Sequence, residues 1–136
     1  FYILIRILKG KEDRLRVTER YGTSDIKRKD GKVIWFHAAS IGESLSILPL
    51  LKKLNSDKSI DQIILTTGTL TSANILKDKL SKKIIHQFIP FDVPSYIHKF
   101  LNHWNPSLAV FVESEIWPNF LTELKKRIKV LKEAYT

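Results

Sequence analysis

The chain has 136 residues, which is enough for one domain with its own core, and hydrophobic residues make up 43% of it, which excludes a disordered polymer. It contains no cysteine, so disulfides, thiolate metal sites and a cysteine nucleophile are also excluded. The net charge of +9 lies mainly at the ends: residues 1–32 carry ten basic and five acidic groups, residues 121–136 carry five and two, and residues 33–120 carry eight and seven. A nucleic-acid-binding domain more often spreads its charge over a folded face. A basic N-terminal arm fits an anionic membrane surface at least as well, and nucleic acid is the least favoured partner.

Residues 1–32 are expected to form a basic N-terminal helix, over residues 1–20, and a polar loop. The segment from Phe1 to Leu8 is apolar apart from Arg6. It is too short to cross a bilayer, because a spanning helix needs roughly 20 residues. The chain begins with Phe rather than Met, and three interpretations of this segment stay open: the tail of a longer anchor, an interfacial helix, or part of the core.

The next segment is predicted to be a buried strand, a tight turn and a helix. Residues 33–36 are apolar without a break, which is typical of a strand covered on both faces. Apolar residues then recur on one helical stripe, and a proline interrupts the predicted helix. The stripe consists of Ile41, Leu45, Leu48, Leu51 and Leu54, and the proline is Pro49.

The turn before this helix carries Ser40, Gly42 and Glu43. Ser40 and Glu43 have the Ser-x-x-Glu spacing of a capping box, and Gly42 allows a ligand or a second backbone to approach the first helical turn. Two interpretations of Glu43 stay open. It is either a capping carboxylate, or a general base at the carboxyl end of a strand, where α/β sheets bind ligands. The two roles compete, since a carboxylate bound to the Ser40 N–H is poorly placed to accept a substrate proton.

The rest of the chain repeats the alternation of strand and helix. The order β-α-β-α-β-α-β-α predicts an α/β fold with a Rossmann-like parallel sheet. A hydroxyl-rich turn, which contains Thr66 and Thr67, follows the second strand, and such hydroxyls are more often helix caps than ligand contacts. The later strands are expected at 61–66, 84–89 and 108–112, and the later helices around 73–80, 97–104 and 117–124.

Two carboxylates, Glu113 and Glu115, follow the fourth predicted strand. Either Glu115 caps a helix or faces solvent while Glu113 bonds to backbone donors, or Glu113 shares a cleft with Glu43, because the carboxyl ends of parallel strands converge on one edge. His37 is expected to be a buried, hydrogen-bonded imidazole. The sequence has no metal-binding motif, no nucleophile elbow, no P-loop and no dinucleotide fingerprint, so no metal and no cofactor are expected.

Several motifs together resemble the N-terminal part of the 3-deoxy-D-manno-octulosonic acid (Kdo) transferases. Each motif alone is weak, but their order and spacing are quite specific and cover most of the chain. They are Glu19-Arg-Tyr-Gly22, Ser40-Ile-Gly-Glu43 before a helix with Pro49, Thr66-Thr-Gly-Thr-Leu-Thr71, Ile89-Pro-Phe-Asp-Val-Pro94, Lys99-Phe-Leu101, Pro106 and Glu113-Ser-Glu-Ile-Trp-Pro-Asn119.

The resemblance implies the N-terminal half of a GT-B glycosyltransferase, which moves Kdo from CMP-Kdo to the lipid A precursor of lipopolysaccharide at the cytoplasmic face of the inner membrane. It implies that Glu43 is the general base and that Glu113 stabilises the transition state. The candidate acceptor contacts are Ser40, Gly42, Thr66 and Thr67. The expected partners are the lipid A precursor and the membrane surface.

The chain also departs from the family pattern. Leu70 and Ser72 replace the usual Pro and Gly, and the chain stops after residues 128–136, where the family continues into another strand. Residues 33–136 are therefore expected to be a truncated acceptor-binding domain without the donor domain, and inactive alone. It stays open whether a separate chain supplies the donor domain. The alternative function is a non-catalytic module that binds anionic lipid or another anion.

Overall fold

The computed structural model describes residues 16–112, 118–127 and 129–133. The expected helix falls largely on residues 1–15, outside the described residues, and the described part of its range ends in a short 3-10 helix. The elements, in chain order, are η1 (Val17–Tyr21), β1 (Val33–Ala38), α2 (Ile41–Asn55), β2 (Gln62–Thr67), α3 (Leu70–Leu76), β3 (Ile84–Phe88), α4 (Pro94–Trp104), β4 (Leu108–Val112), α5 (Pro118–Arg127) and β5 (Lys129–Glu133).

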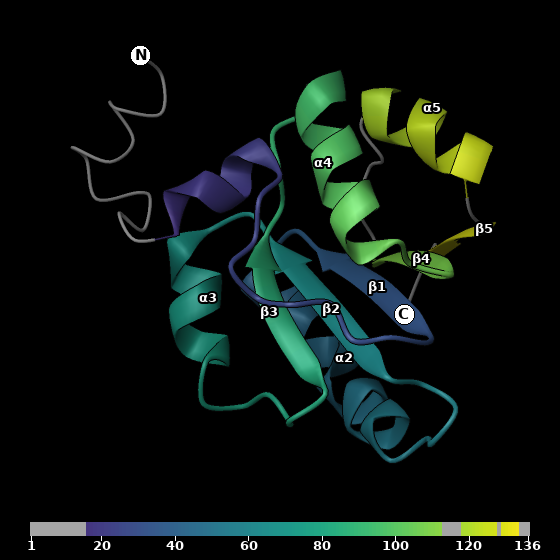
Figure 1. The fold of residues 1–136 in the computed structure, drawn as a ribbon. Helices are drawn as coiled ribbons and strands as arrows, with labels where there is room; N and C mark the ends of the chain where they lie inside the picture. Colours follow the sequence, from purple (N-terminus) through teal and green to yellow (C-terminus); the bar gives the residue numbers. More distant parts are fainter. Residues whose placement is uncertain (1–15, 113–117, 128, 134–136) are drawn as a thin grey trace.

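The strands form one parallel sheet in the order β3-β2-β1-β4-β5, with helices in the connections (Figure 1). This confirms the predicted Rossmann-like α/β fold. The chain moves from β1 outward to β3 and then returns to place β4 on the other side of β1, so the order reverses between β1 and β4. All strands end at one edge, called here the carboxyl edge, and ligands of open α/β sheets bind at such a reversal.

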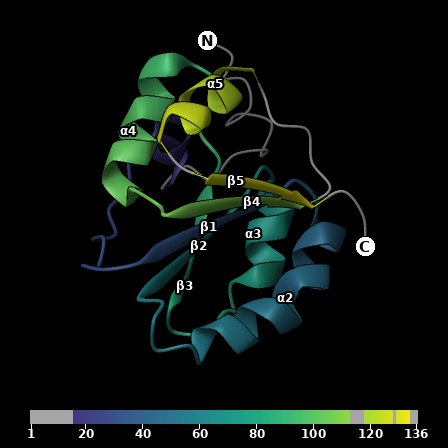
Figure 2. The same ribbon diagram turned by 90° about the vertical axis from the view of Figure 1, so that its right-hand side faces the viewer.

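Helices cover both faces of the sheet (Figure 2). Side chains from α2 and α3 pack with alternate residues of the strands on one face, and side chains from α4 and α5 pack on the other. Trp35 is central to the second core, where its ring makes edge or tilted contacts with the rings of Phe100, Phe111 and Phe120. Every residue of β1 is buried, as its apolar run predicts.

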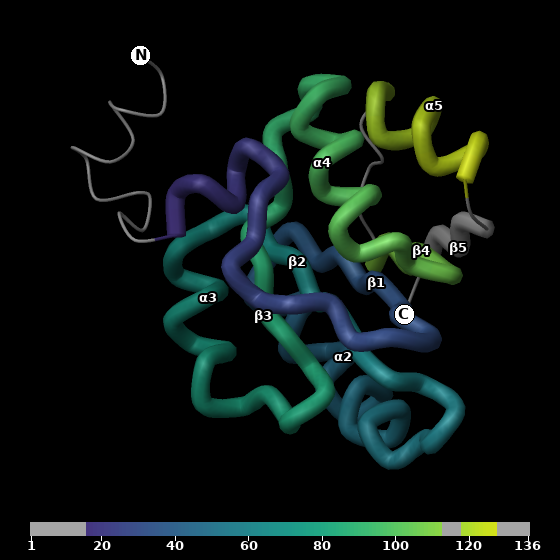
Figure 3. The backbone as a smooth tube through the Cα atoms, viewed as in Figure 1, coloured from purple at the N-terminus to yellow at the C-terminus, as the bar shows by residue number. Residues whose placement is uncertain are grey.

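An irregular segment, residues 22–32, covers the part of the second face that the helices leave open. This strap runs across the strands from the end of η1 to the start of β1 (Figure 3). The side chains beneath it are polar: Gln87 donates to the Thr23 carbonyl at 2.9 Å, and Gln62 accepts from the Lys29 N–H at 3.0 Å. Arg28 binds the strap to the end of α4, near the amino ends of the strands, where its side chain donates to the Trp104 carbonyl at 2.6 Å.

The structure adds one strand to the four that were predicted. β5 pairs with β4 in parallel over residues 129–133, a segment for which the sequence analysis expected no strand. Three of its five residues are charged, so it lacks the apolar run by which the other strands were recognised. Among the described strands β5 lies at an edge of the sheet, and charged side chains are common on edge strands.

None of the helices within the described ranges is both long enough and apolar enough to span a bilayer.

Candidate active site at the carboxyl edge

Glu43 and Ser40 form the capping box that the sequence predicted. The Ser40 side chain accepts from the Glu43 N–H at 3.2 Å, while Glu43 Oε1 accepts from the Ser40 N–H at 3.0 Å and from the Ser40 hydroxyl at 3.1 Å. The box begins α2 directly after β1, so it lies at the carboxyl edge beside the reversal of strand order. The carboxylate also interacts favourably with the dipole of this 15-residue helix.

The capping box uses only one oxygen of Glu43. Both bonds to the carboxylate end on Oε1, and among the described residues none forms a hydrogen bond with Oε2. The side chain is only partly exposed, whereas Ser40 beside it is exposed. Capping and proton transfer therefore do not compete for the same atom. The cap instead fixes the carboxylate through one oxygen and leaves the second oxygen without a hydrogen bond among the described residues.

The glycines of the carboxyl edge differ from those of the strap. Gly22 and Gly31 have φ angles of +88° and +108° and close neighbours, so their backbone requires glycine. Gly42 and Gly68 have no positive φ. A Cβ at Gly42 would meet only the Ser40 hydroxyl, at 3.9 Å, and a Cβ at Gly68 would meet nothing within 4 Å. The fold itself does not require glycine at these two positions, which leaves open backbone that a ligand can approach.

Thr66 and Thr67 are not in the turn but are the last two residues of β2, and both are fully buried. Thr66 Oγ1 accepts from Trp35 Nε1 at 2.8 Å and lies 2.8 Å from His37 Nδ1. Thr67 Oγ1 lies 2.7 Å from His86 Nε2. Both hydroxyls are therefore engaged inside the protein, and their contact with an acceptor stays a prediction.

His37 is the buried, hydrogen-bonded imidazole that was predicted. Its pKa is lowered from 6.5 to about 4, mainly because the ring is buried; a hydrogen bond to the Thr66 backbone opposes this shift, and the charge of Arg20 adds to it. The imidazole is therefore neutral at pH 7 and is a structural part of the edge.

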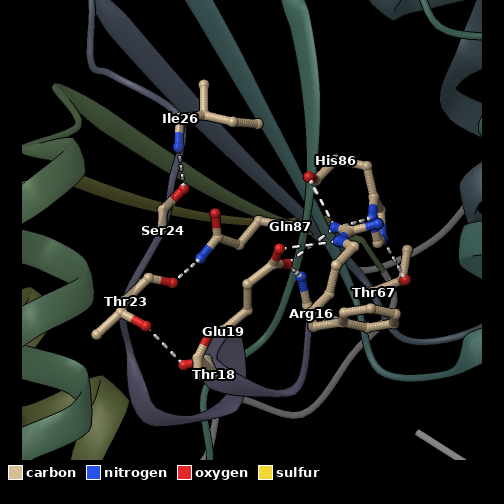
Figure 4. Close-up of polar contacts among 10 residues, drawn as sticks. Arg16, Thr18, Glu19, Thr23, Ser24, Ile26, Thr67, His86 and Gln87 are labelled. Atoms are coloured by element: carbon tan, nitrogen blue, oxygen red, sulfur yellow. Dashed lines mark hydrogen bonds and ion pairs between the residues drawn. The ribbon is translucent and has the colours of Figure 1, made fainter. Parts of the chain in front are cut away.

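Arg16, just before η1, and Glu19, within it, form a polar cluster with His86 that was not predicted from the sequence (Figure 4). Arg16 donates to both oxygens of Glu19 at 2.8 Å, to the His86 carbonyl at 3.1 Å, and to His86 Nδ1 at 2.9 Å. Glu19 in turn accepts from the Phe88 N–H at 2.8 Å. These side chains thus bond backbone groups on the outer side of β3, as a neighbouring strand would, and they protect that edge. The motif Glu19-Arg-Tyr-Gly22 was the only sequence signal, and it does not reveal its distant partners.

The same cluster keeps His86 neutral. Burial, together with the smaller effect of the charges of Arg16 and Arg20, lowers its pKa from 6.5 to about 3. Because the Arg16 guanidinium can only donate, Nδ1 accepts, and Nε2 carries the proton toward Thr67.

Asp92 connects the segment after β3 with the start of α5. Its carboxylate accepts from the Asn119 N–H at 3.3 Å and from the Phe120 N–H at 3.1 Å, and the Asn119 side chain donates to the Asp92 carbonyl at 3.0 Å. Glu113 and Glu115 lie outside the described residues. Val112, which precedes them, is paired with Ala38 at the end of β1. The sequence predicts that Glu113 shares a cleft with Glu43. Their proximity stays a prediction.

Within the described ranges, no group of three or more His, Asp or Glu side chains has a geometry that would hold a metal ion.

Comparison with known proteins identifies the family. Residues 15–131 match the family described as 3-deoxy-D-manno-octulosonic-acid transferase (kdotransferase). A 3-deoxy-D-manno-octulosonic acid transferase of Rickettsia bellii is 40% identical over 95% of this chain and 31% of its own length. A probable mitochondrial transferase of the same name from Arabidopsis thaliana is 38% identical over 88% of the chain and 27% of its own length. The transferase of Haemophilus influenzae is 33% identical over 90% and 29%.

No solved structure matches the chain. The chain spans less than a third of the length of these relatives. A family match over most of the sequence, and several relatives above 30% identity, show that this chain belongs to the 3-deoxy-D-manno-octulosonic acid transferase family.

Proposed function

We propose that this chain is the acceptor-binding part of a GT-B Kdo transferase, which moves Kdo from CMP-Kdo to the lipid A precursor. The observation that carries the proposal is the Glu43 carboxylate, which is fixed through Oε1 by the capping box and has Oε2 available at the carboxyl edge. Family membership supports the reaction class.

In the proposed reaction Glu43 is the general base. A hydroxyl oxygen of the acceptor sugar bonds to the anomeric carbon of Kdo, while the bond from that carbon to the phosphate oxygen of CMP breaks and CMP leaves with the electron pair. The hydroxyl proton passes to Glu43 Oε2. A sugar hydroxyl is a poor nucleophile, and a positioned base typically accelerates such a step by about 10²–10⁴-fold. Glu113 is proposed to stabilise the transition state.

The acceptor is proposed to lie over the β1–α2 turn and the β2–α3 turn, where Gly42 and Gly68 leave the backbone open. A phosphorylated glycolipid suits this edge, because the helix α2 begins there and the N-terminus of a helix favours an anion. Ser40, Thr66 and Thr67 remain proposed acceptor contacts, and the two threonines require a rearrangement of their present hydrogen bonds.

The site of action is proposed to be the cytoplasmic face of the inner membrane. The concentration of positive charge in residues 1–32 supports contact with anionic lipid there. CMP-Kdo is proposed to bind to a donor-binding part that is not among these 136 residues, so the chain alone is expected to bind acceptor without transferring Kdo.

Acceptor binding by the 136-residue chain tests this function. We expect it to bind lipid A precursor in detergent micelles, and to bind the dephosphorylated precursor and empty micelles much more weakly. Glu43→Gln should bind the precursor as the wild type does, since binding uses the edge rather than the proton-accepting oxygen. Equal affinity for the precursor and for simple anionic micelles would contradict the acceptor assignment and favour a general anionic-lipid module. Turnover of CMP-Kdo by the chain alone would contradict the expectation that CMP-Kdo binds to a part of the enzyme outside these 136 residues.

A further inference from the structure

Arg20 is a buried cation that joins two turns of the carboxyl edge. Its side chain is 4% exposed. One end of the guanidinium donates to the Ile89 carbonyl, just after β3, at 3.0 Å, and the other end donates to the Gly68 carbonyl, just after β2. The Arg20 carbonyl also accepts from the Phe91 N–H at 2.9 Å, so side chain and backbone hold the same region.

Aromatic rings enclose this guanidinium. Its central carbon lies 5.4 Å from the centre of the Phe88 ring and 5.5 Å from that of the Phe91 ring. Tyr21, the next residue, packs edge-on against Phe91 and Tyr96, which fixes η1 against α4. The arginine is therefore held in one position from several sides.

Stability is a poor explanation for a cation in this place. Removing a charge from water is costly, and a well-packed apolar side chain of similar volume is often at least as stabilising. A planar guanidinium instead fixes geometry, because its donors point in set directions and two of them reach separate carbonyls. The two carbonyls follow neighbouring strands, so their relative position is the property that Arg20 determines.

We propose that Arg20 is a positioning residue, which holds the turn at Gly68 and the segment after Ile89 in the arrangement that the acceptor requires. This inference rests on the proposed function, since it assigns to Arg20 the shape of the proposed acceptor surface. Arg20 binds the carbonyl of Gly68, while the Cβ side of this glycine faces open space. Gly68 thus presents its open side to the ligand, and Arg20 determines where that side lies.

Arg28 provides a matched control. It also donates to several carbonyls, including those of Trp104 at 2.6 Å and Gly31 at 3.0 Å, but it does so near the amino ends of the strands. Arg20→Met and Arg28→Met each remove a guanidinium that bridges carbonyls and keep a long side chain. Only the first variant disturbs the carboxyl edge, so a difference between the two separates positioning from a general loss of stability.

Two readouts are measured on the 136-residue chain. Amide exchange over residues 66–76 should become about tenfold faster in Arg20→Met, because the loss of charge-assisted bonds frees this turn, and should stay unchanged in Arg28→Met. Affinity for lipid A precursor in micelles should fall about tenfold in Arg20→Met and stay within about twofold of the wild type in Arg28→Met. Gly68→Ala should fold normally and lose affinity as well.

The outcomes distinguish the two proposals. If the wild-type chain does not bind the precursor, the proposed function fails, and the acceptor role of Arg20 fails with it, even where exchange shows that Arg20 orders the turn. If the wild type binds but Arg20→Met matches Arg28→Met in both readouts, Arg20 is structural only and the inference is wrong. If Arg20→Met does not fold, Arg20→Lys takes its place, since lysine keeps the charge but cannot bridge two carbonyls in one plane. Unchanged exchange and affinity in Arg20→Lys would overturn the inference.

Discussion

Glu43 has two roles in this account, and thermal unfolding can separate the capping role from the chemical one. Glu43→Gln keeps an oxygen that can accept from the Ser40 N–H, because glutamine is also found at this position of capping boxes. Glu43→Ala removes that acceptor, and Ser40→Ala removes the hydroxyl that accepts from the Glu43 N–H at 3.2 Å. We expect a small loss of stability for the first change and a larger loss for the other two.

The expected magnitudes follow from the contacts. Loss of an N-cap side chain typically costs about 1 kcal/mol, which we expect for Ser40→Ala and for Glu43→Ala. Glu43→Gln loses only the interaction of the charge with the dipole of α2, about 0.5 kcal/mol. For a chain of this size, 1 kcal/mol corresponds to a shift in Tm of about 3–6 °C.

The assay is thermal unfolding of the four proteins at pH 7.5, followed by circular dichroism. A Glu43→Gln protein as unstable as Ser40→Ala would refute the reasoning, because it would show that the charge, and not the hydrogen bond, makes the cap. An unchanged Tm in Ser40→Ala would show that the box contributes nothing to the fold in solution.

Three further predictions concern the same edge. The free energy of unfolding should decrease as the pH falls from about 6.5 to 4, because His37 takes up a proton in the unfolded chain before it does so in the folded chain. In His37→Asn the slope of this free energy against pH should be smaller by up to about 1.4 kcal/mol per pH unit, which urea titrations at several pH values would measure. Gly42→Ala should raise stability by about 0.5–1 kcal/mol and weaken binding of lipid A precursor, whereas unchanged binding would exclude ligand approach there. Asp92→Ala should lower the free energy of unfolding by about 1–2 kcal/mol and make amide exchange at Asn119 and Phe120 faster, because the Asp92 carboxylate accepts from both N–H groups at the start of α5. Unaltered exchange would show that these two hydrogen bonds do not stabilise the start of α5.

Local patterns predicted the fold and the helix cap. The apolar runs of β1 and β2 identified buried strands, and the Ser-x-x-Glu spacing identified the box at Ser40 and Glu43. Both depend on residues that are close in sequence. The turn was predicted to begin at Thr66, which was also the last residue of the predicted strand 61–66, but β2 extends through Thr67. Threonine suits a strand as well as a turn, and only the pairing with β1 and β3 shows where β2 ends.

Contacts between residues that are far apart along the chain could not be predicted from the sequence. Arg16 reaches His86, and Arg20 reaches Gly68 and Ile89, across 48 to 70 positions of the chain. The motif around these arginines contributed to the family resemblance, but its spacing gives no indication of the partners. The spacing also gave no sign that the capping box uses only one oxygen of Glu43, a feature on which its proposed role as a base depends.

The most direct test of the central claim is transfer of Kdo from CMP-Kdo to lipid A precursor, with this chain and a donor-binding part of a family member added together. We expect transfer in the mixture, and a loss of transfer rate of about 100-fold or more in Glu43→Gln with unchanged affinity for the precursor. Transfer at the wild-type rate by Glu43→Gln would contradict the assignment of Glu43 as the base. No transfer in the mixture, with the chain bound to precursor and the donor part bound to CMP-Kdo, would contradict the assignment of this chain as a catalytic acceptor half.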